Sequence, residues 1–256
     1  MIKNIYQYLI PLKIRVRLRI FINQLISPVY YGRKFYCNCC GRSFRKFLPK
    51  GYIKRYNAEC PYCGSLERTR LLLMYLGKET VLFSEKKLKV LHFAPEYSLF
   101  RIFTDLDIEY IDADINPAYA TKIIDITDIP YPDDFFDLII CSHVLGHVPD
   151  EDKAVRELRR VLSVTGIALI MTLINPDSDF TFEDVKITGP DERLRAYGEP
   201  DLYRLHGMDF PARLQRQGFI VECIDYRERL SDETCKRHSL GDGKRELIFK
   251  CTKTDS

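Results

Sequence analysis

Short apolar segments alternate with helix-like segments over residues 88–173, and this alternation constrains the fold more than any other feature of the chain. Apolar runs predict strands over residues 88–93, 108–114, 122–124, 136–141 and 167–173. Helices are predicted between them over residues 98–106 and over residues 150–162, where apolar side chains recur at helical spacing. Strands joined through helices pair in parallel, so the sequence predicts an α/β fold with a Rossmann-like, doubly wound sheet.

Acidic side chains stand at the ends of these predicted strands. Asp114 ends the second strand, 18 residues after Glu96, and Asp125 follows the third strand. In doubly wound sheets the ligand lies beyond the carboxyl ends of the strands, and an acid at about this spacing binds ribose hydroxyls. We therefore expect Asp114 to bind a ribose, with Asp112 as the second candidate.

The segment from Asp125 to Asp150 resembles the adenine-binding acid and the motif after strand four of class I S-adenosylmethionine-dependent methyltransferases. Residues 156–162, with a glycine at position 166, are similar to the helix and turn that come next in that family. The resemblance implies a site for S-adenosylmethionine, with methionine at the turn over residues 93–96, adenine at the acid, and the sulfonium after strand four. The cofactor-binding residues it implies are Phe93, Ala94, Glu96, Asp114, Asp125, Ile126, Cys141 and Ser142.

A polar elbow, Ser142-His-Val-Leu-Gly-His147, follows the strand over residues 136–141. Methyl transfer to a hydroxyl group is assisted by a base, and an imidazole can accept a proton near neutral pH. We predict that His143 is this base, because it lies at the ligand edge of the sheet. His147 would share its face if the elbow is helical, and it is either a second catalytic residue or a structural one.

Two cysteine pairs, Cys37-x2-Cys40 and Cys60-x2-Cys63, are separated by 19 residues. A two-residue gap lets two thiolates converge on one metal ion, and two such pairs complete a tetrahedron. The sequence therefore predicts a small zinc-ribbon module with a closed, structural zinc site. Cys39 is a poor ligand because it is adjacent to Cys40. A helix from Ser65 to Leu76, capped by Ser65, is expected to dock the ribbon on the larger domain.

The turn over residues 92–96 indicates which subgroup of this family the chain resembles. It reads His-Phe-Ala-Pro-Glu where most class I members have an acid-x-Gly-x-Gly turn. The two cysteine pairs, the stretch Ser65-Leu-Glu-Arg68 and the Ala-Pro-Glu turn resemble a subgroup associated with bacterial surface-polysaccharide biosynthesis. That subgroup implies a sugar or another glycan-type small molecule as the methyl acceptor.

These patterns divide the chain into a basic arm over residues 1–34, the zinc ribbon with its connecting helix over 35–78, and a methyltransferase domain over 79–256. Residues 177–211 form a polar insertion with several prolines and glycines, which is typical of a substrate lid. Arg204 and His206 lie in this insertion, and we predict that they bind a carboxylate, phosphate or hydroxyl group of the acceptor.

The charge is distributed unevenly along the chain. Residues 1–78 hold 16 Lys/Arg and 2 Asp/Glu, whereas residues 79–256 hold 23 and 34. The first part is therefore expected to bind anions. Its mixture of basic and apolar residues suits an anionic lipid surface, although residues 12–20 alternate with strand periodicity. No run of 18 apolar residues predicts a membrane span, so we expect a cytoplasmic protein that can lie at the inner face of the membrane.

Two other functions remain open. Basic residues interleaved with aromatic ones suit RNA binding, so the protein could instead methylate RNA through its zinc ribbon. The aromatic residues concerned are Phe35, Tyr36, Phe44, Phe47, Tyr52 and Tyr56. The altered turn over residues 92–96 also fits a scaffold without catalytic activity. Nucleic acid is the less expected partner, and these same aromatic residues could instead form the core of the ribbon.

Overall fold

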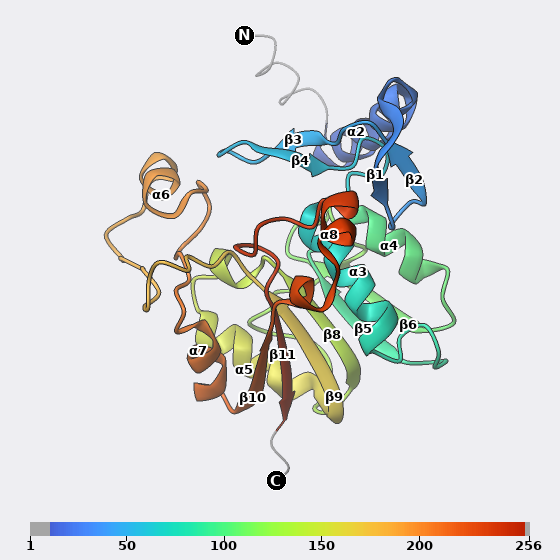
Figure 1. Ribbon diagram of the computed structural model, residues 1–256. Coiled ribbons are helices and arrows are strands. Elements are labelled where there is room, and N and C mark those ends of the chain that lie inside the picture. The colour runs from blue at the N-terminus through green and yellow to red at the C-terminus, as the bar shows by residue number, and fades with distance from the viewer. Residues whose placement is uncertain (1–10, 254–256) are drawn as a thin grey trace.

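A computed structural model describes residues 11–253 (Figure 1). Its centre is a seven-stranded sheet of order β10-β11-β9-β8-β5-β6-β7. β11 runs antiparallel to β9 and β10, and the remaining pairs are parallel. The α/β, Rossmann-like prediction is therefore confirmed, and β10 and β11 add an antiparallel hairpin to the sheet. The strands are β5 (Lys89–Phe93), β6 (Glu109–Asp114), β7 (Lys122–Ile123), β8 (Phe136–Ser142), β9 (Leu162–Met171), β10 (Phe219–Ile224) and β11 (Ile248–Lys253).

Both faces of the sheet are covered by helices. One core contains α5 (Glu151–Val161) and α7 (Phe210–Arg216), and the other contains α3 (Glu67–Glu79) and α4 (Tyr97–Thr104). Alternate residues of each central strand enter opposite cores: in β8, for example, Ile139 packs in the first core and Ile140 in the second. Because side chains alternate across a strand, burial on both faces requires the continuous apolar runs in the sequence.

Helix α3 links the N-terminal module to the sheet (Figure 1). Its side chains Leu71, Leu72, Tyr75 and Leu76 are buried against the sheet, which agrees with the predicted docking role. The predicted cap was wrong. The helix begins at Glu67, and the hydroxyl of Ser65 lies 3.1 Å from the Sγ atom of Cys37 instead of capping the helix.

The N-terminal module consists of α2 (Leu12–Ile26), the 3-10 turn η1 (Ser27–Tyr30) and two hairpins. The first hairpin pairs β1 (Tyr31–Cys37) with β2 (Arg42–Phe44), and the second pairs β3 (Leu48–Lys50) with β4 (Arg55–Glu59). The strand-like alternation over residues 12–20 lies within α2, so that interpretation was wrong. Leu, Arg and Lys favour helices, and within residues 11–253 no strand pairs with this segment. Residues 1–10 of the predicted arm lie outside the described part.

The C-terminal part completes both cores and covers the elbow after β8. The insertion over residues 177–211 contains α6 (Pro190–Tyr197), and short bridges join Ile174 to His206 and Phe182 to Leu205. After β10 come the 3-10 turn η3 (Tyr226–Arg229) and α8 (Asp232–His238), which lies between the N-terminal module and the sheet (Figure 1). The helix α7 follows the insertion and leads into β10.

Candidate cofactor site and cysteine cluster

A cavity of about 550 Å³ lies at the carboxyl ends of β5, β6 and β8, where the strand order reverses. Ligands of doubly wound sheets bind at this reversal point. The volume lies within the ~300–1,000 Å³ that is typical of small-molecule sites. Seven residues predicted for cofactor binding or catalysis border the cavity: Phe93, Ala94, Asp114, Asp125, Ile126, His143 and His147.

The two carboxylates near the end of β6 have different surroundings. Asp112 is buried, and its oxygens accept hydrogen bonds from the backbone N–H and the hydroxyl of Thr121 at 2.7 and 2.5 Å. Asp114 borders the cavity, and its Oδ1 atom accepts the backbone N–H of Asn116 at 2.7 Å, which leaves Oδ2 for a ligand. Burial raises the pKa of Asp114, so hydroxyl donors from a ligand would stabilise its charged form. The geometry therefore favours Asp114 over Asp112 as a ligand-binding residue.

Asp125 and Ile126 form another part of the cavity wall. The Oδ1 atom of Asp125 accepts hydrogen bonds from the N–H and the hydroxyl of Thr127 at 2.8 and 2.9 Å, which fixes the exposed carboxylate. Ile126 is buried and apolar. A carboxylate beside an apolar surface can accept a hydrogen bond from an amino group while the attached ring packs on the aliphatic side chain.

Two non-glycine residues that border the cavity have left-handed backbone conformations. Ala94 follows β5 with a φ angle of 48°, and His143 follows β8 with a φ angle of 57°. Such conformations cost a residue with a side chain about 1–2 kcal/mol, and they concentrate at ligand sites. Ala94 thus adopts a backbone conformation that glycine reaches without strain, although this turn lacks glycine.

Three predicted cofactor-binding residues, Glu96, Cys141 and Ser142, do not border the cavity. Cys141 is fully buried in the core that contains α5, because its position in β8 directs the thiol away from the ligand edge. Ser142 donates a long hydrogen bond of 3.5 Å from its hydroxyl to the Oε1 atom of Glu96. Glu96 and Ser142 therefore lie together, directly behind the residues that border the cavity.

His143 has a defined tautomer. Its Nε2 atom lies 3.1 Å from the carbonyl oxygen of Arg245, and because a carbonyl only accepts, Nε2 must carry the proton. The Nδ1 atom is then the basic atom of the ring. Burial, together with the charges of Arg68 and Arg245, lowers the pKa of His143 well below its ordinary value of 6.5. The imidazole is therefore neutral at pH 7 and can accept a proton.

His147 ends the 3-10 turn η2 (Leu145–His147) and contacts the insertion. Its Nδ1 atom lies 3.3 Å from the carbonyl oxygen of Asp201 and 3.5 Å from the carboxylate of the same residue. The elbow is a 3-10 turn and not an α-helix, so the condition for a shared face with His143 is not met. The contact with Asp201 favours the structural alternative for His147.

Arg204 holds the elbow after β8 in place. Its Nη1 atom donates to the carbonyl oxygens of Leu145 and Val148 at 2.9 and 2.7 Å, and Nη2 donates to that of Pro149 at 2.9 Å. The remaining Nε atom donates to Glu183 at 2.7 Å. The guanidinium is almost completely buried, and these partners engage all three of its nitrogens. Arg204 therefore acts as a structural clamp, and this geometry disfavours the predicted acceptor-binding role.

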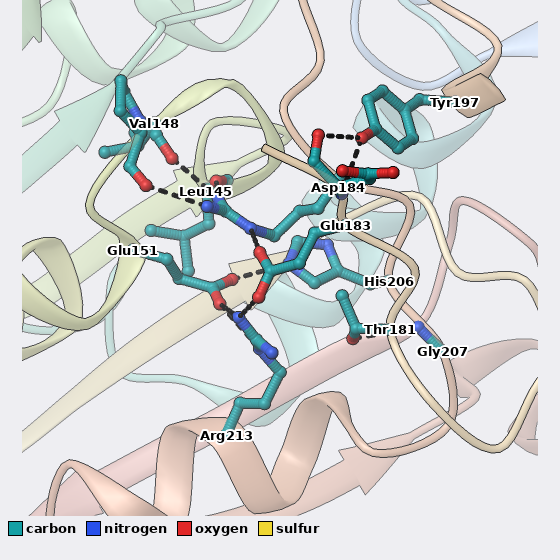
Figure 2. Close-up of polar contacts among 12 residues, drawn as sticks. Leu145, Val148, Glu151, Thr181, Glu183, Asp184, Tyr197, His206, Gly207 and Arg213 are labelled. Carbon is teal, nitrogen blue, oxygen red and sulfur yellow. Dashed lines mark hydrogen bonds and ion pairs between the residues drawn. The ribbon is translucent and has the colours of Figure 1, made fainter. Parts of the chain in front are cut away.

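His206 is buried in the same network (Figure 2). Its Nδ1 atom lies 2.9 Å from the hydroxyl of Thr172, and Nε2 lies 2.6 Å from the Oε1 atom of Glu151. The other oxygen of Glu151 accepts a hydrogen bond from the Nε atom of Arg213 at 2.7 Å. Both ring nitrogens of His206 are therefore occupied, which also disfavours its predicted role in acceptor binding.

The sulfur atoms of Cys37, Cys40, Cys60 and Cys63 converge in the N-terminal module. They lie within 4.8 Å of one another, with Cys37 and Cys63 3.6 Å apart and Cys40 and Cys60 3.8 Å apart. These distances are too long for disulfide bonds. A tetrahedral ion at ~2.3 Å from each sulfur would separate the sulfurs by ~3.8 Å, so the geometry fits zinc. Cys39 lies outside this four-cysteine cluster.

A buried guanidinium beside the cluster also fits a metal centre. Arg70 is 0% exposed and donates to the carbonyl oxygens of Ala58, Ser65, His238 and Ser239. In residues 11–253 no carboxylate pairs with it. An uncompensated buried charge is costly, whereas four thiolates on a divalent ion carry a net charge of about −2 that would offset it.

Part of the chain is similar in sequence to known proteins. A family model described as "Methyltransferase domain" matches residues 103–170. Over 99 residues the chain is 32% identical to the uncharacterized protein MJ0638 of Methanocaldococcus jannaschii, covering 35% of this chain and 43% of that protein. Over 52 residues it is 42% identical to the ubiquinone/menaquinone biosynthesis C-methyltransferase UbiE of Vibrio vulnificus, covering 20% of each. The chain therefore spans less than half the length of these curated relatives.

One solved structure extends the likeness to nearly the whole fold. The [4+2]-cyclase SpnF matches with a TM-score of 0.54 and 14% sequence identity, over 92% of this chain and 95% of that one. At this identity the likeness concerns the fold and not the reaction. The family match shows a likeness to methyltransferase domains over residues 103–170, and the larger part of the chain has the Rossmann-like α/β methyltransferase fold, joined to an N-terminal module with four clustered cysteines.

Proposed function

We propose that the protein transfers a methyl group from S-adenosylmethionine to a hydroxyl group of a sugar or another glycan-type small molecule, in polysaccharide biosynthesis. The observation that supports it best is the cavity at the strand ends, which combines carboxylates, an apolar wall and a neutral imidazole. We assign Asp114 to the ribose, Asp125 and Ile126 to the adenine, and residues 93–96 to the methionine moiety. The four-cysteine cluster binds a structural zinc ion.

The side chains at the cavity suit transfer to a hydroxyl group. When bound, S-adenosylmethionine supplies a methyl group that a nucleophile can take from its sulfonium sulfur. His143 holds its ring through the hydrogen bond from Nε2 to the Arg245 carbonyl, which leaves Nδ1 free to accept the hydroxyl proton. Ile126 and Phe93 shield the site from water, because both are buried and apolar.

A second cleft offers a place for the acceptor. It has a volume of about 1,030 Å³ and lies between the N-terminal module and the segment around α8. Its end near Glu246 is one residue from Arg245, whose carbonyl holds His143. Basic and acidic residues both border it, which suits an acceptor with several polar groups. The basic residues are Lys34, Lys54, Arg55, Lys236 and Arg237, and the acidic ones are Glu67, Glu233, Asp242 and Glu246.

The proposal is tested by calorimetry and by transfer of a labelled methyl group. The purified full chain should bind S-adenosylhomocysteine, and with labelled S-adenosylmethionine it should label a component of cell extract. Label in a water-soluble or lipid-extractable glycan supports the proposal, and nuclease-sensitive label supports RNA methylation instead. No heat of binding up to millimolar ligand would indicate a scaffold without a cofactor.

Substitution of Asp114 by alanine should weaken S-adenosylhomocysteine binding by about tenfold or more, because hydrogen bonds to a charged carboxylate contribute about 1.5–3 kcal/mol. Isothermal titration calorimetry measures this change. Glu109→Ala is the matched control, since Glu109 is an exposed acid at the opposite end of β6. Equal affinities of the Asp114→Ala variant and the wild type would remove Asp114 from the ribose site.

Substitution of His143 by alanine should lower kcat with the labelled acceptor about 100-fold or more, while S-adenosylhomocysteine affinity is retained. Because the pKa of His143 is lowered in the folded state, the wild-type rate should not fall as the pH decreases through 6.5; the loss should come at lower pH. A pH–rate profile of both proteins measures this. Full turnover by the variant would disprove the role of His143 as a base.

Helix α2 supports a peripheral position on an anionic membrane. Ile14, Phe21 and Leu25 are exposed and lie on one face of the helix, in a region where basic residues outnumber acidic ones by 16 to 2. This combination suits an acidic lipid surface. No helix within residues 11–253 is long and apolar enough to cross a bilayer. Flotation with anionic but not with neutral vesicles would support this position, and sedimentation away from both would contradict it.

Two exposed tyrosines keep RNA methylation as the second candidate. Tyr52 and Tyr56 are 63% and 82% exposed near the turn between β3 and β4, with Lys54 between them in the sequence. Exposed aromatic rings can stack on bases while lysines contact phosphates. The other predicted aromatic contacts are weaker candidates, because three of the side chains form the core of the module: Phe35, Phe44 and Phe47.

A further inference from the structure

Three polar side chains form a buried cluster behind the cavity. The Nε atom of Arg68, the Nε2 atom of His92 and the Oε2 atom of Glu96 are buried and have no hydrogen-bond partner among the described residues. Arg68 Nε and His92 Nε2 each lie 3.4 Å from a carboxylate oxygen of Glu96. The Arg68 contact is an ion pair and the His92 contact joins an imidazole to a carboxylate, and both have poor hydrogen-bond geometry. The cluster therefore retains unused capacity for both an anion and a cation.

The position of this Arg68–Glu96 cluster connects it to the cavity. Glu96 is two residues after Ala94, and its hydrogen-bond partner Ser142 directly precedes His143. Both Ala94 and His143 border the cavity. The charge of Arg68 is also close enough to His143 to lower the pKa of its imidazole. The cluster thus lies directly behind the cavity wall at the ends of β5 and β8, away from the acids that follow β6 and β7.

A chain of contacts keeps Glu96 in its charged form. The hydroxyl of Tyr110 lies 3.0 Å from the Nδ1 atom of His92, and burial raises the pKa of this phenol, so it stays protonated and donates. His92 then carries its own proton on Nε2, directed at Glu96. Burial opposes ionisation of Glu96, but the contacts with His92 and Arg68 outweigh it and lower the pKa of the carboxyl group.

We propose that Arg68 and Glu96 bind the amino-acid end of the cofactor, so that helix α3, which begins in the N-terminal module, completes the cofactor site. The carboxylate of the methionine moiety pairs with the guanidinium, and its ammonium group pairs with the carboxylate of Glu96. Charge-assisted hydrogen bonds replace the loose 3.4 Å contacts. This inference rests on the proposed function, because it takes S-adenosylmethionine as the cofactor.

The arrangement also explains how the site can work without a glycine-rich turn. Such a turn normally lets the backbone approach the cofactor closely. Here Ala94 and Pro95 occupy the turn, and the polar contacts come from side chains instead. Arg68 lies five residues after Cys63, so the fold of the four-cysteine cluster sets its position.

Calorimetry with two ligands tests the inference. S-adenosylhomocysteine carries the amino-acid moiety, whereas 5′-methylthioadenosine shares its nucleoside but lacks that moiety. Arg68→Gln should weaken S-adenosylhomocysteine binding about tenfold or more and change methylthioadenosine binding less than about twofold. Arg229→Gln is the matched control, because Arg229 forms a 3.4 Å ion pair with Glu79 at the exposed end of α3. It should affect neither ligand.

The outcomes separate the inference from the proposed function. If the wild type binds both ligands and Arg68→Gln binds S-adenosylhomocysteine equally well, or loses both ligands equally, the inference is overturned and the proposed function stands. If the wild type binds neither ligand, both are overturned. Glu96→Gln should show the same selective loss, and it serves as the test if thermal denaturation shows that Arg68→Gln does not fold.

Discussion

Replacing Cys60 with serine is expected to abolish zinc binding and to unfold the N-terminal module. Structural zinc sites contribute an apparent binding free energy of about 10–16 kcal/mol, and this energy is available only to the folded chain. Loss of the metal also leaves the buried charge of Arg70 without compensation. Because α3 forms part of both the module and the core, the midpoint of thermal unfolding of the whole chain should fall.

Metal analysis and circular dichroism measure this outcome. The wild type should contain one zinc ion per chain, and a strong chelator should reproduce the effect of Cys60→Ser. Cys39→Ser is the matched control, because Cys39 lies in the same module but outside the cluster. This control should keep one zinc ion per chain. A Cys60→Ser protein with unchanged zinc content and stability would show that the cluster is not a metal site.

Replacing Glu151 with alanine should destabilise the protein by about 3–5 kcal/mol, the range for removing one partner of a buried ion pair. Glu151 is 2% exposed on its side chain and pairs with His206 at 2.6 Å and Arg213 at 2.5 Å (Figure 2). The substitution leaves the buried His206 without its carboxylate partner, and it leaves the partly buried Arg213 with only the longer contact to Glu183. Urea denaturation measures the change. Asp152→Ala, an exposed acid in the same helical turn, should change stability by less than about 0.5–1 kcal/mol.

The carboxylate of Glu151 should also make the stability of the folded protein depend on pH in the acid range. Burial would raise the pKa of Glu151, but His206, Arg213 and Arg204 outweigh it and lower the pKa from 4.5 to about 2. A depressed pKa stabilises the folded state above the unfolded value of 4.5, and this contribution of about 3 kcal/mol is lost as the pH falls from 4.5 toward 2. In Glu151→Ala this part of the acid dependence should be absent. Parallel acid-unfolding curves for both proteins would contradict the assignment.

The sequence determined the main sheet because burial on two faces leaves a direct pattern. The apolar runs in residues 88–173 predict the five parallel strands β5 to β9, with ends that differ by a few residues. The cysteine pairs were equally informative, because the geometry of a two-residue gap is local. Asp114 and Asp125 were found at the cavity because parallel strands end at one edge of the sheet.

Local sequence patterns gave poor predictions for residues whose hydrogen-bond partners lie far away in the sequence. Arg204 and His206 were expected to face the acceptor, but their hydrogen-bond partners lie 21–59 residues earlier in the sequence. Glu151 gave no signal of its own, since an acid in the first turn of a helix is ordinary. The short alternation in α2 was ambiguous, because nine residues with mixed apolar and basic side chains fit a helix as well as a strand.

The sequence by itself therefore determined the sheet, the module with the four-cysteine cluster and the edge at which a cofactor would lie, because each depends on spacing within one segment. Only the tertiary structure decided which polar groups at that edge are free. It left one oxygen of Asp114 free for a ligand, whereas both oxygens of Asp112 have partners. It also engaged Arg204 and His206 in internal hydrogen bonds and placed Arg68 in contact with Glu96. Hydrogen bonds between segments far apart in the sequence decide these roles, and no local pattern records them.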